Sequence, residues 1–249
     1  MRKFWRAVFC ICLVIFLCCC GTFVYDFFQS RQSHSIVTDY TNPTQATTAE
    51  LRENPINFEK IKEQNKDIFS WIRIKNTNID YPILSPNGKS DDYYLRRNIK
   101  EEYDRQGVIY IENCNSTDWS DPVTLIYGHN IWTMGTMFYQ LHSFSDKDFF
   151  NKNKYIEIYA PGRILTYEIY SAFEYDDRHI MNSFNFEDDK IYSDFIDYTL
   201  NPISLNKNVR NGVNVTTDDN IIVLSTCIKT KEEMRYLVVG VLVKDENTK

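Results

Sequence analysis

Three residue types that together support acyl transfer stand near the ends of strand-like segments. The apolar run 221–224 is followed by the small polar residues Ser225 and Thr226 and then by Cys227. A cysteine thiolate is a strong nucleophile, and positive charge nearby favours the thiolate over the thiol. We therefore interpret Cys227 as a candidate nucleophile; the alternative is a buried structural thiol. Strand side chains alternate, so Ser225 shares the face of Cys227, and we expect it, with Thr226, to border a substrate.

Arg235 begins the apolar segment 235–243, which follows the cysteine strand after the loop 228–234. If the two segments pair as an antiparallel hairpin, Cys227 and Arg235 face each other. A guanidinium at that point can stabilise an oxyanion that forms when the thiolate attacks a carbonyl group. The alternative is an arginine whose charged end only reaches solvent at the strand edge.

Of the four histidines, His129 is the best placed for acid–base catalysis. It directly follows a buried type of strand, and Gly128 before it permits a sharp turn or a close approach to a neighbouring strand. His34 lies in a polar linker, His142 in a helical pattern and His179 in a charged loop, where solvation or packing is the commoner role. We expect His129 to act with the cysteine and the arginine.

Eight segments rich in β-branched and aromatic residues are mostly bounded by Gly, Pro, Asn or Asp, as is typical of strands. Their number and regular spacing predict a mainly β fold with one closed, eight-stranded β-barrel. The segments are 69–74, 79–84, 106–112, 122–128, 155–160, 164–175, 220–227 and 235–243.

Helices are predicted at three places around these strands. Apolar residues between 56 and 69 suggest a short amphipathic helix, capped near Asn54–Pro55, that packs on the barrel. One helical insert, 134–152, follows the fourth strand. A second, 185–203, precedes the cysteine strand, and its acidic residues at 187–189 favour a helix start through the helix dipole. The expected apolar stripe of this insert is Phe186, Ile191, Phe195, Ile196 and Leu200.

The N-terminus has the pattern of a single-pass membrane anchor. The tail 1–6 is basic, and the uncharged run 7–25 that follows is about 28 Å long as a helix, close to the ~30 Å hydrocarbon core of a bilayer. The positive-inside rule places the tail in the cytoplasm and the rest of the chain outside. Residues 26–54 predict a polar stalk before a catalytic domain at 55–249. A cleaved signal peptide and a lipoprotein are alternatives whose motifs are not evident.

Composition narrows the possible partners. The net charge is −6, and no basic stripe is present, which disfavours nucleic acid as a partner. Five of the seven cysteines lie in the membrane segment, and the others are Cys114 and Cys227. Outside the membrane segment, the sequence therefore allows at most one disulfide, between Cys114 and Cys227. The acidic stretch 187–189 lacks the spacing of a calcium loop.

The stretch 223–227 resembles the TLxTC motif of the sortases, membrane-anchored cysteine transpeptidases of Gram-positive bacteria. Valine replaces the first threonine of the motif, and the other motif residues match. The upstream stretch "LIYGHN" and the opening "IFSWIRIKNTNIDYPIL" are also similar to that family. The resemblance covers roughly 54–243. It implies that His129 is the catalytic histidine, Cys227 the nucleophile and Arg235 the arginine that stabilises the substrate.

The N-terminal helix and the insert before the cysteine strand resemble class B sortases. That class implies a secreted substrate with a C-terminal sorting signal similar to NPxTx, cleaved after its Thr. The implied acceptor is an amine of a peptidoglycan cross-bridge or of its lipid-linked precursor, and neither a metal nor an organic cofactor is needed. The same resemblance places Asp91 or Asp92 near the site, and a solvated turn is the alternative for both.

Four other functions fit the sequence less well. A papain-like protease would place its cysteine early and its histidine later, the reverse of the order here. A pilin-polymerising, class C sortase usually carries an N-terminal lid and often a second membrane span, and neither is evident. A thiol endopeptidase that acts mainly by hydrolysis would share the same three residues. An adhesion domain would not need the three together.

Overall fold

The computed structural model describes residue 9 and residues 12–13, 16–17, 20–22, 24–25 and 51–249. In this described part of the chain, no helix is long and apolar enough to cross a membrane. The predicted tail 1–6 lies outside the described residues, as do about half of the predicted anchor 7–25 and most of the predicted stalk 26–54. The chain divides into two compact units, Met1–Asp39 and Tyr40–Lys249.

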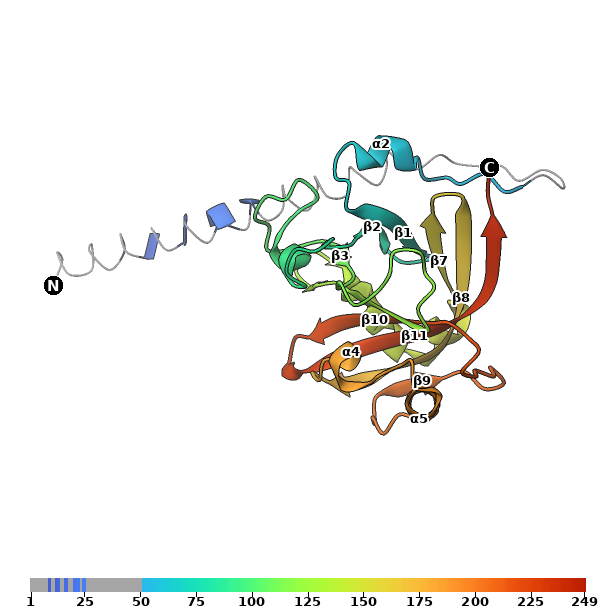
Figure 1. Cartoon of the computed structure of the whole chain (residues 1–249). Helices are drawn as coiled ribbons and strands as arrows, with labels where there is room; N and C mark the ends of the chain where they lie inside the picture. Colours follow the sequence, from blue (N-terminus) through green and yellow to red (C-terminus); the bar gives the residue numbers. More distant parts are fainter. Residues whose placement is uncertain (1–8, 10–11, 14–15, 18–19, 23, 26–50) are drawn as a thin grey trace. The chain divides into compact units, whose positions relative to one another are not determined.

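Eight strands of the second unit form a closed β-barrel (Figure 1). Their order is β11-β10-β4-β3-β2-β1-β7-β8, and pairing of β11 with β8 closes the ring. Two neighbouring pairs, β10–β4 and β2–β3, are parallel, and the others are antiparallel. The predicted eight-stranded barrel is confirmed. Its strands are β1 (Ile68–Ile74), β2 (Asp80–Leu84), β3 (Ile109–Tyr110), β4 (Val123–Tyr127), β7 (Tyr155–Ala160), β8 (Arg163–Asp176), β10 (Ile221–Ile228) and β11 (Lys231–Asn247).

Three further strands, each of two or three residues, had not been predicted. Strand β9 (Lys207–Val209) pairs with β8 beside the ring. Strands β5 (Asn130–Ile131) and β6 (Thr136–Met137) form a separate small sheet directly after β4. This small sheet fixes the direction in which the chain leaves His129.

The N-terminal helix is shorter than the helix predicted between residues 56 and 69. Helix α2 spans Phe58–Lys62, and its N-cap is Asn57, whose Oδ1 accepts a hydrogen bond of 3.0 Å from the amide of Lys60. The prediction near Asn54–Pro55 was therefore wrong by a few residues. Ile68 and Phe69 belong to strand β1, because a pattern of buried residues on both faces suits a barrel strand as well as a helix.

The last residues of the predicted stalk belong to the barrel unit. Arg52 forms an ion pair of 3.1 Å with Glu157, and Asn54 donates a hydrogen bond of 2.8 Å to the carbonyl of Ala160. Both partners lie on β7. The folded domain thus begins before residue 55, where the sequence had placed its boundary.

The first insert, 134–152, is only partly helical. It contains β6, the 3₁₀ helix η2 (Phe138–Ser145) and helix α3 (Lys147–Lys152). The second insert contains helix α5 (Asp189–Leu200), whose N-cap Asp188 accepts hydrogen bonds from the amides of Lys190 and Ile191. The short helix α4 (Ile180–Ser183) precedes it. Neither α4 nor the 3₁₀ helix η1 (Tyr93–Arg96) had been predicted.

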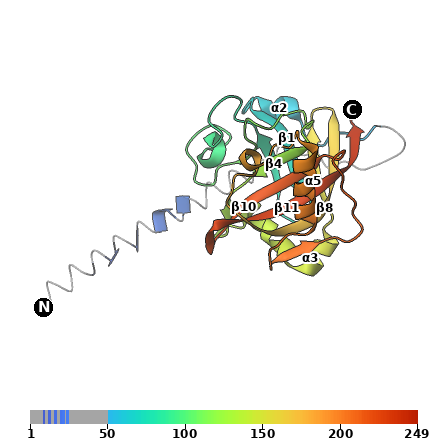
Figure 2. The ribbon, with the colours of Figure 1, turned by 60° about the horizontal axis from the view of Figure 1, so that its bottom comes forward.

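Helix α5 explains why β10 reads as a continuous apolar run. Its Tyr192, Phe195 and Ile196 pack in one buried cluster with alternate residues of β10, such as Ile221 and Val223. Figure 2 shows α5 lying across β10, β11 and β8. The remaining apolar residues of β10 alternate onto the opposite face, so both faces of this strand are buried from Ile221 to Thr226, while Cys227 at its end is exposed. Of the predicted stripe, Ile191 and Leu200 are only half-buried, and Tyr192 takes the buried position instead.

Candidate active site

The parallel pair of strands β4 and β10 brings His129 and Cys227 to the same edge of the barrel. Tyr127 and Ser225 are register partners in this pair, and His129 and Cys227 each come two residues later. Parallel strands run in the same direction, so both residues leave the sheet at equivalent points. Two hydrogen bonds join the chains beyond the register. The amide of Gly128 donates to the carbonyl of Ser225 over 3.2 Å, and the Thr226 hydroxyl donates to the carbonyl of Gly128 over 2.8 Å.

Gly128 permits this close approach because it has no side chain. A Cβ atom placed there would lie 2.5 Å from Cδ1 of Ile109 and 2.7 Å from the ring of Phe138. Both neighbours are fully buried and have little room to move. The glycine therefore allows β4 to pass tightly under the site.

Replacing Gly128 by alanine is expected to destabilise the fold by about 1–3 kcal/mol, the usual cost of overpacking a core. The same change should displace His129, the next residue, and lower the catalytic rate more than the stability loss explains. Urea unfolding followed by fluorescence measures the first effect, and peptide cleavage at a temperature where the variant stays folded measures the second. Unchanged stability would contradict the tight packing described here.

Arg235 lies opposite Cys227 across the hairpin of β10 and β11, as the sequence predicts. The two residues are direct register partners, which places their side chains on the same face of the sheet. The Arg235 Nη1 donates hydrogen bonds of 3.0 Å to the carbonyls of Glu232 and Met234. These bonds hold the guanidinium at the base of the hairpin, and in the described part of the chain they use only Nη1. Nε and Nη2 remain to meet a substrate.

His129 is oriented by the 3₁₀ helix η1. Its Nε2 lies 2.7 Å from the carbonyl oxygen of Leu95. A carbonyl oxygen can only accept, so Nε2 carries the hydrogen and Nδ1 is left to exchange a proton with substrate. Burial lowers the pKa of His129, the hydrogen bond to Leu95 opposes that shift, and the nearby charge of Arg96 adds to it. The imidazole is therefore neutral at pH 7.

The lowered pKa of His129 predicts a loss of stability in mild acid. In the unfolded chain the imidazole takes up a proton near its ordinary pKa of 6.5, whereas the folded state resists protonation. The stabilising contribution is thus fully present above that pH and is lost as the pH falls through the folded pKa. The variant His129→Gln lacks the titratable group. Its melting temperature relative to that of wild type should therefore be higher at pH 5 than at pH 8. Above pH 8 the difference between the two melting temperatures should not depend on pH. A difference that stays constant from pH 8 to pH 5 would contradict the shift.

Ser225 and Thr226 are buried, so they do not form the exposed polar border that the sequence suggested. Their exposed fractions are 6% and 2%. Thr226 points to the face opposite Cys227 and uses its hydroxyl on the Gly128 carbonyl. It is better described as part of the support for the site. Ser225 shares the face of Cys227 and of Tyr127, its register partner.

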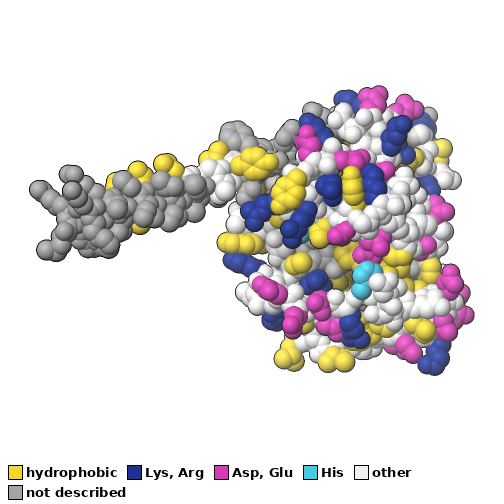
Figure 3. Space-filling model, turned by 60° about the vertical axis from the view of Figure 1, so that its left-hand side comes forward, with side chains coloured by type: hydrophobic (Ala, Val, Ile, Leu, Met, Phe, Trp, Pro, Cys, Tyr) yellow, Lys and Arg dark blue, Asp and Glu magenta, His cyan; other side chains and the backbone are white. Residues whose placement is uncertain are grey.

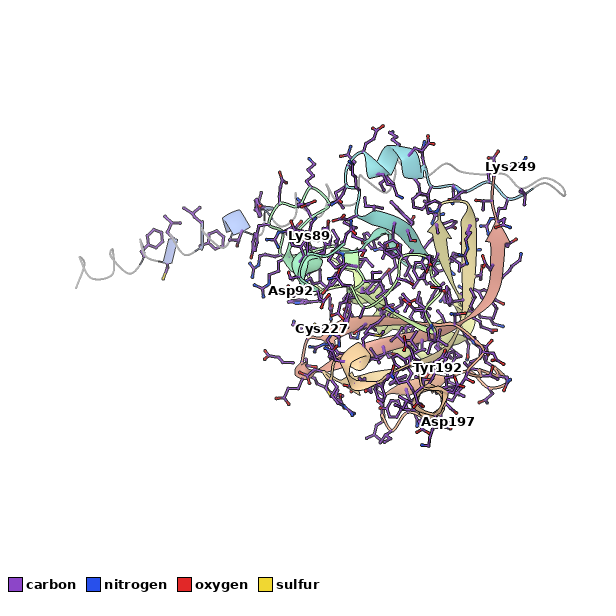
Figure 4. All side chains as sticks on the ribbon, viewed as in Figure 1. Lys89, Asp92, Tyr192, Asp197, Cys227 and Lys249 are labelled. Carbon is purple, nitrogen blue, oxygen red and sulfur yellow. The ribbon has the colours of Figure 1, made fainter. Side chains whose placement is uncertain are left out.

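Asp91 is exposed, and its carboxylate is also held within a turn. Its Oδ1 accepts hydrogen bonds from the amide and the side chain of Asn113, at 3.0 and 2.8 Å. Burial raises the pKa of Tyr110, and the charges of Glu112, Asp92, Cys227 and Asp91 add to that shift. Figure 4 shows Cys227 at one end of the barrel, below the segment of Asp92 and Lys89 and away from Asp197 on α5.

Both cysteines of the barrel unit are free thiols, so the disulfide left open by the sequence is absent. The Cys114 Sγ lies 3.9 Å from a carboxylate oxygen of Glu112. Burial, and then the charges of Glu112 and Asp91, raise the pKa of Cys114 to about 11. A thiol with so high a pKa is a poor nucleophile at neutral pH. The raised pKa therefore disfavours Cys114 as the nucleophile.

Two histidines that were not predicted to take part in catalysis, His142 and His179, lie close to the site. His142, on η2, has its Nε2 3.1 Å from the carbonyl oxygen of Cys227, and Asn130 donates to the same oxygen over 2.9 Å. His179, the N-cap of α4, lies 2.8 Å from the buried carboxylate of Glu112. No local pattern marks these contacts, because each joins segments far apart in the sequence.

One face of the barrel unit carries charges of both signs. Acidic and basic side chains are interspersed on the face of the barrel unit shown in Figure 3. In the described part of the chain, no group of three or more His, Cys, Asp or Glu side chains is arranged to hold a metal ion. The arrangement instead offers a thiol, an imidazole and a guanidinium, a set suited to acyl transfer through a thioester.

The fold and this set of side chains define a sortase. The sortase domain model matches residues 72–243, and the chain belongs to the sortase family, a family of cysteine transpeptidases. Two of its relatives are named sortase B. The chain is 31% identical to sortase B of Listeria monocytogenes over 88% of each chain. It is 28% identical to sortase B of Staphylococcus aureus over 98% of each. A solved sortase B of Bacillus anthracis superposes with a TM-score of 0.73 at 27% identity, covering 89% of this chain and 99% of that one.

Proposed function

We propose that this protein is a class B sortase that joins secreted proteins to the cell wall. It would cleave an NPxTx-like sorting signal after Thr and transfer the new carboxyl end to an amine of peptidoglycan or of its lipid-linked precursor. The observation that carries the proposal is the register of β10. This strand pairs with β4 on one side and with β11 on the other, and so gathers His129, Cys227 and Arg235 at one edge.

The proposed first half-reaction forms a thioester. The Cys227 thiol gives its proton to Nδ1 of His129, and the thiolate attacks the carbonyl carbon of the signal's Thr. Arg235 stabilises the oxyanion through Nε and Nη2. The peptide C–N bond then breaks, and the proton on Nδ1 passes to the departing amine. The lowered pKa of His129 makes its imidazolium a stronger acid than a free imidazolium for this step.

The proposed second half-reaction reverses these roles. An incoming amine attacks the thioester carbonyl, Nδ1 of His129 accepts the proton that the amine loses, and the Cys227 thiolate leaves and recovers a proton. A solved structure of the S. aureus sortase B contains a substrate, and a further solved sortase B contains triglycine. Their ligands support a peptide donor and a short amine acceptor for this chain as well.

The proposed location is the outer face of the cell membrane, with residues 7–25 as the anchor and the barrel outside. This location would let the enzyme meet its substrates as they leave the secretion channel. Protease added to intact cells should then remove the barrel and leave the N-terminal tail protected. Protection of the barrel in intact cells would refute this topology.

The function is tested with the full-length chain in detergent and two peptides, one with an NPxTx-type signal and one with an LPxTG-type signal. We expect cleavage after Thr of the first peptide, and a ligated product when a glycine-containing or diaminopimelate-type amine is added. Hydrolysis of the peptide at the same rate with and without the amine would identify a thiol endopeptidase instead. Preference for the LPxTG-type peptide would refute the class B signal.

A further inference from the structure

The carbonyl group of the nucleophile is held by two side chains from outside its own strand. The carbonyl oxygen of Cys227 accepts a hydrogen bond of 2.9 Å from Nδ2 of Asn130 and lies 3.1 Å from Nε2 of His142. The two nitrogen atoms also lie within hydrogen-bond distance of each other, at 3.1 Å. Asn130 comes from β5 and His142 from η2, so three separate segments meet at this carbonyl.

This support stands where the sheet becomes irregular. The register of β10 with β11 shifts between Cys227, paired with Arg235, and Ile228, paired with Lys231. Strand β4, on the other side of β10, has already ended at Tyr127. A strand end with an interrupted ladder is prone to move. The side chains of Asn130 and His142 replace regular pairing at the residue that must be held most firmly.

The chemistry of His142 suits a neutral donor. A carbonyl oxygen can only accept, so His142 supports Cys227 in the tautomer in which Nε2 carries the hydrogen; in the other tautomer Nε2 accepts from Nδ2 of Asn130 instead. The ring packs against the buried Tyr236, with centroids 5.0 Å apart. Burial lowers the pKa of His142, while the bond to Cys227 and the charge of Glu174 on β8 act in the opposite direction. Glu174 forms an ion pair with Lys231 of β11, so the charge of the carboxylate near the imidazole is balanced by an ammonium group.

Asn130 also connects the two halves of the site. It follows His129 directly, so its bond to the Cys227 carbonyl ties the segment of the histidine to the residue of the thiol. The spacing between acid–base group and nucleophile is therefore set partly by this amide. A misplacement of about 1 Å between reacting groups can cost about 100-fold in rate.

We propose that Asn130 and His142 are positioning residues that clamp the backbone of Cys227 and keep its thiol in place for attack. The proposal rests on the proposed function, since it concerns the same nucleophile. Loss of either side chain should lower kcat and leave peptide binding unchanged, because both side chains contact the backbone of Cys227 and the proposal assigns them no contact with the sorting signal.

The test uses the full-length chain with four substitutions: His142→Ala, Asn130→Ala, the conservative His142→Gln, and Ser143→Ala as a matched control on the same helical segment. We expect kcat to fall about 10–100-fold in both clamp variants, with KM within about twofold of wild type. The Gln variant, whose amide can donate from a similar position, should recover most of the rate. The Ser143 variant should match wild type.

Hydrogen exchange provides a readout that needs no turnover. Amides in the peptide that spans 225–231 should exchange faster in His142→Ala and Asn130→Ala, and at the wild-type rate in the Gln and Ser143 variants. Unchanged exchange in both clamp variants, or an unchanged kcat in both, would overturn the proposal. If wild type cleaves no sorting peptide, the proposed function fails, and the exchange experiment still decides the clamp.

Discussion

Replacing Cys227 by alanine is expected to reduce peptide cleavage to background, a loss of at least about 10³-fold. The side chain lies at an exposed strand end, so its removal leaves the fold intact, and melting temperature should change little. Steady-state cleavage of an NPxTx-type peptide, followed by chromatography, measures the loss. Residual cleavage near the wild-type rate would show that another group is the nucleophile.

Cys114 offers a matched control for that experiment. It is the other free cysteine of the barrel unit, and its pKa is raised to about 11 by burial and by neighbouring carboxylates. The Cys114→Ala variant should therefore retain wild-type activity. Iodoacetamide at neutral pH should alkylate the two thiols of the barrel unit at different rates. The slower of the two reactions should be absent in the Cys114→Ala variant.

Replacing Arg235 by alanine is the second change with a large expected effect. Removal of one preorganised group that stabilises an oxyanion costs about 10²–10³-fold in kcat, and Arg235 is the register partner of the nucleophile. Arg235→Lys should recover only part of the rate, because an ammonium group cannot reproduce the planar fork of donors. The measurement is kcat against KM, with the loss expected in kcat.

Arg163 is the control for this change. It forms an exposed ion pair with Asp245 at the opposite end of β8 and β11, and such surface pairs contribute only about 0–1 kcal/mol. Arg163→Ala should leave the rate within about twofold of wild type. An Arg235→Ala variant that is as active as Arg163→Ala would remove the arginine from the reaction.

The strands of the barrel could be predicted from the sequence because each carries its own local pattern. The hairpin of β10 and β11 is the clearest case, since a short polar loop between two apolar runs implies that Cys227 faces Arg235. The parallel pairing of β10 with β4 could not be derived in this way. It joins segments about a hundred residues apart, and only the overall topology brings His129 beside Cys227.

The limits of helix α2 show where local pattern is ambiguous. Ile68 and Phe69 continue the apolar spacing of the helix, yet they belong to β1, because packing in the barrel outweighs a short helical pattern. The roles of Asn130 and His142 had no local signal at all. A histidine in a helical segment is usually a surface or packing residue, and only its distance to the Cys227 carbonyl shows otherwise.

The formation of a thioester between Cys227 and the sorting signal is tested most directly by mass spectrometry of the peptides of the reacted protein. The full-length chain is incubated with an NPxTx-type peptide in the absence of an amine acceptor, quenched in acid and then digested. We expect an added mass equal to the acyl fragment that ends at Thr, located on the peptide that contains Cys227 and lost when an amine is supplied. Cleavage of the peptide with no such adduct, or an adduct on Cys114, would contradict the account.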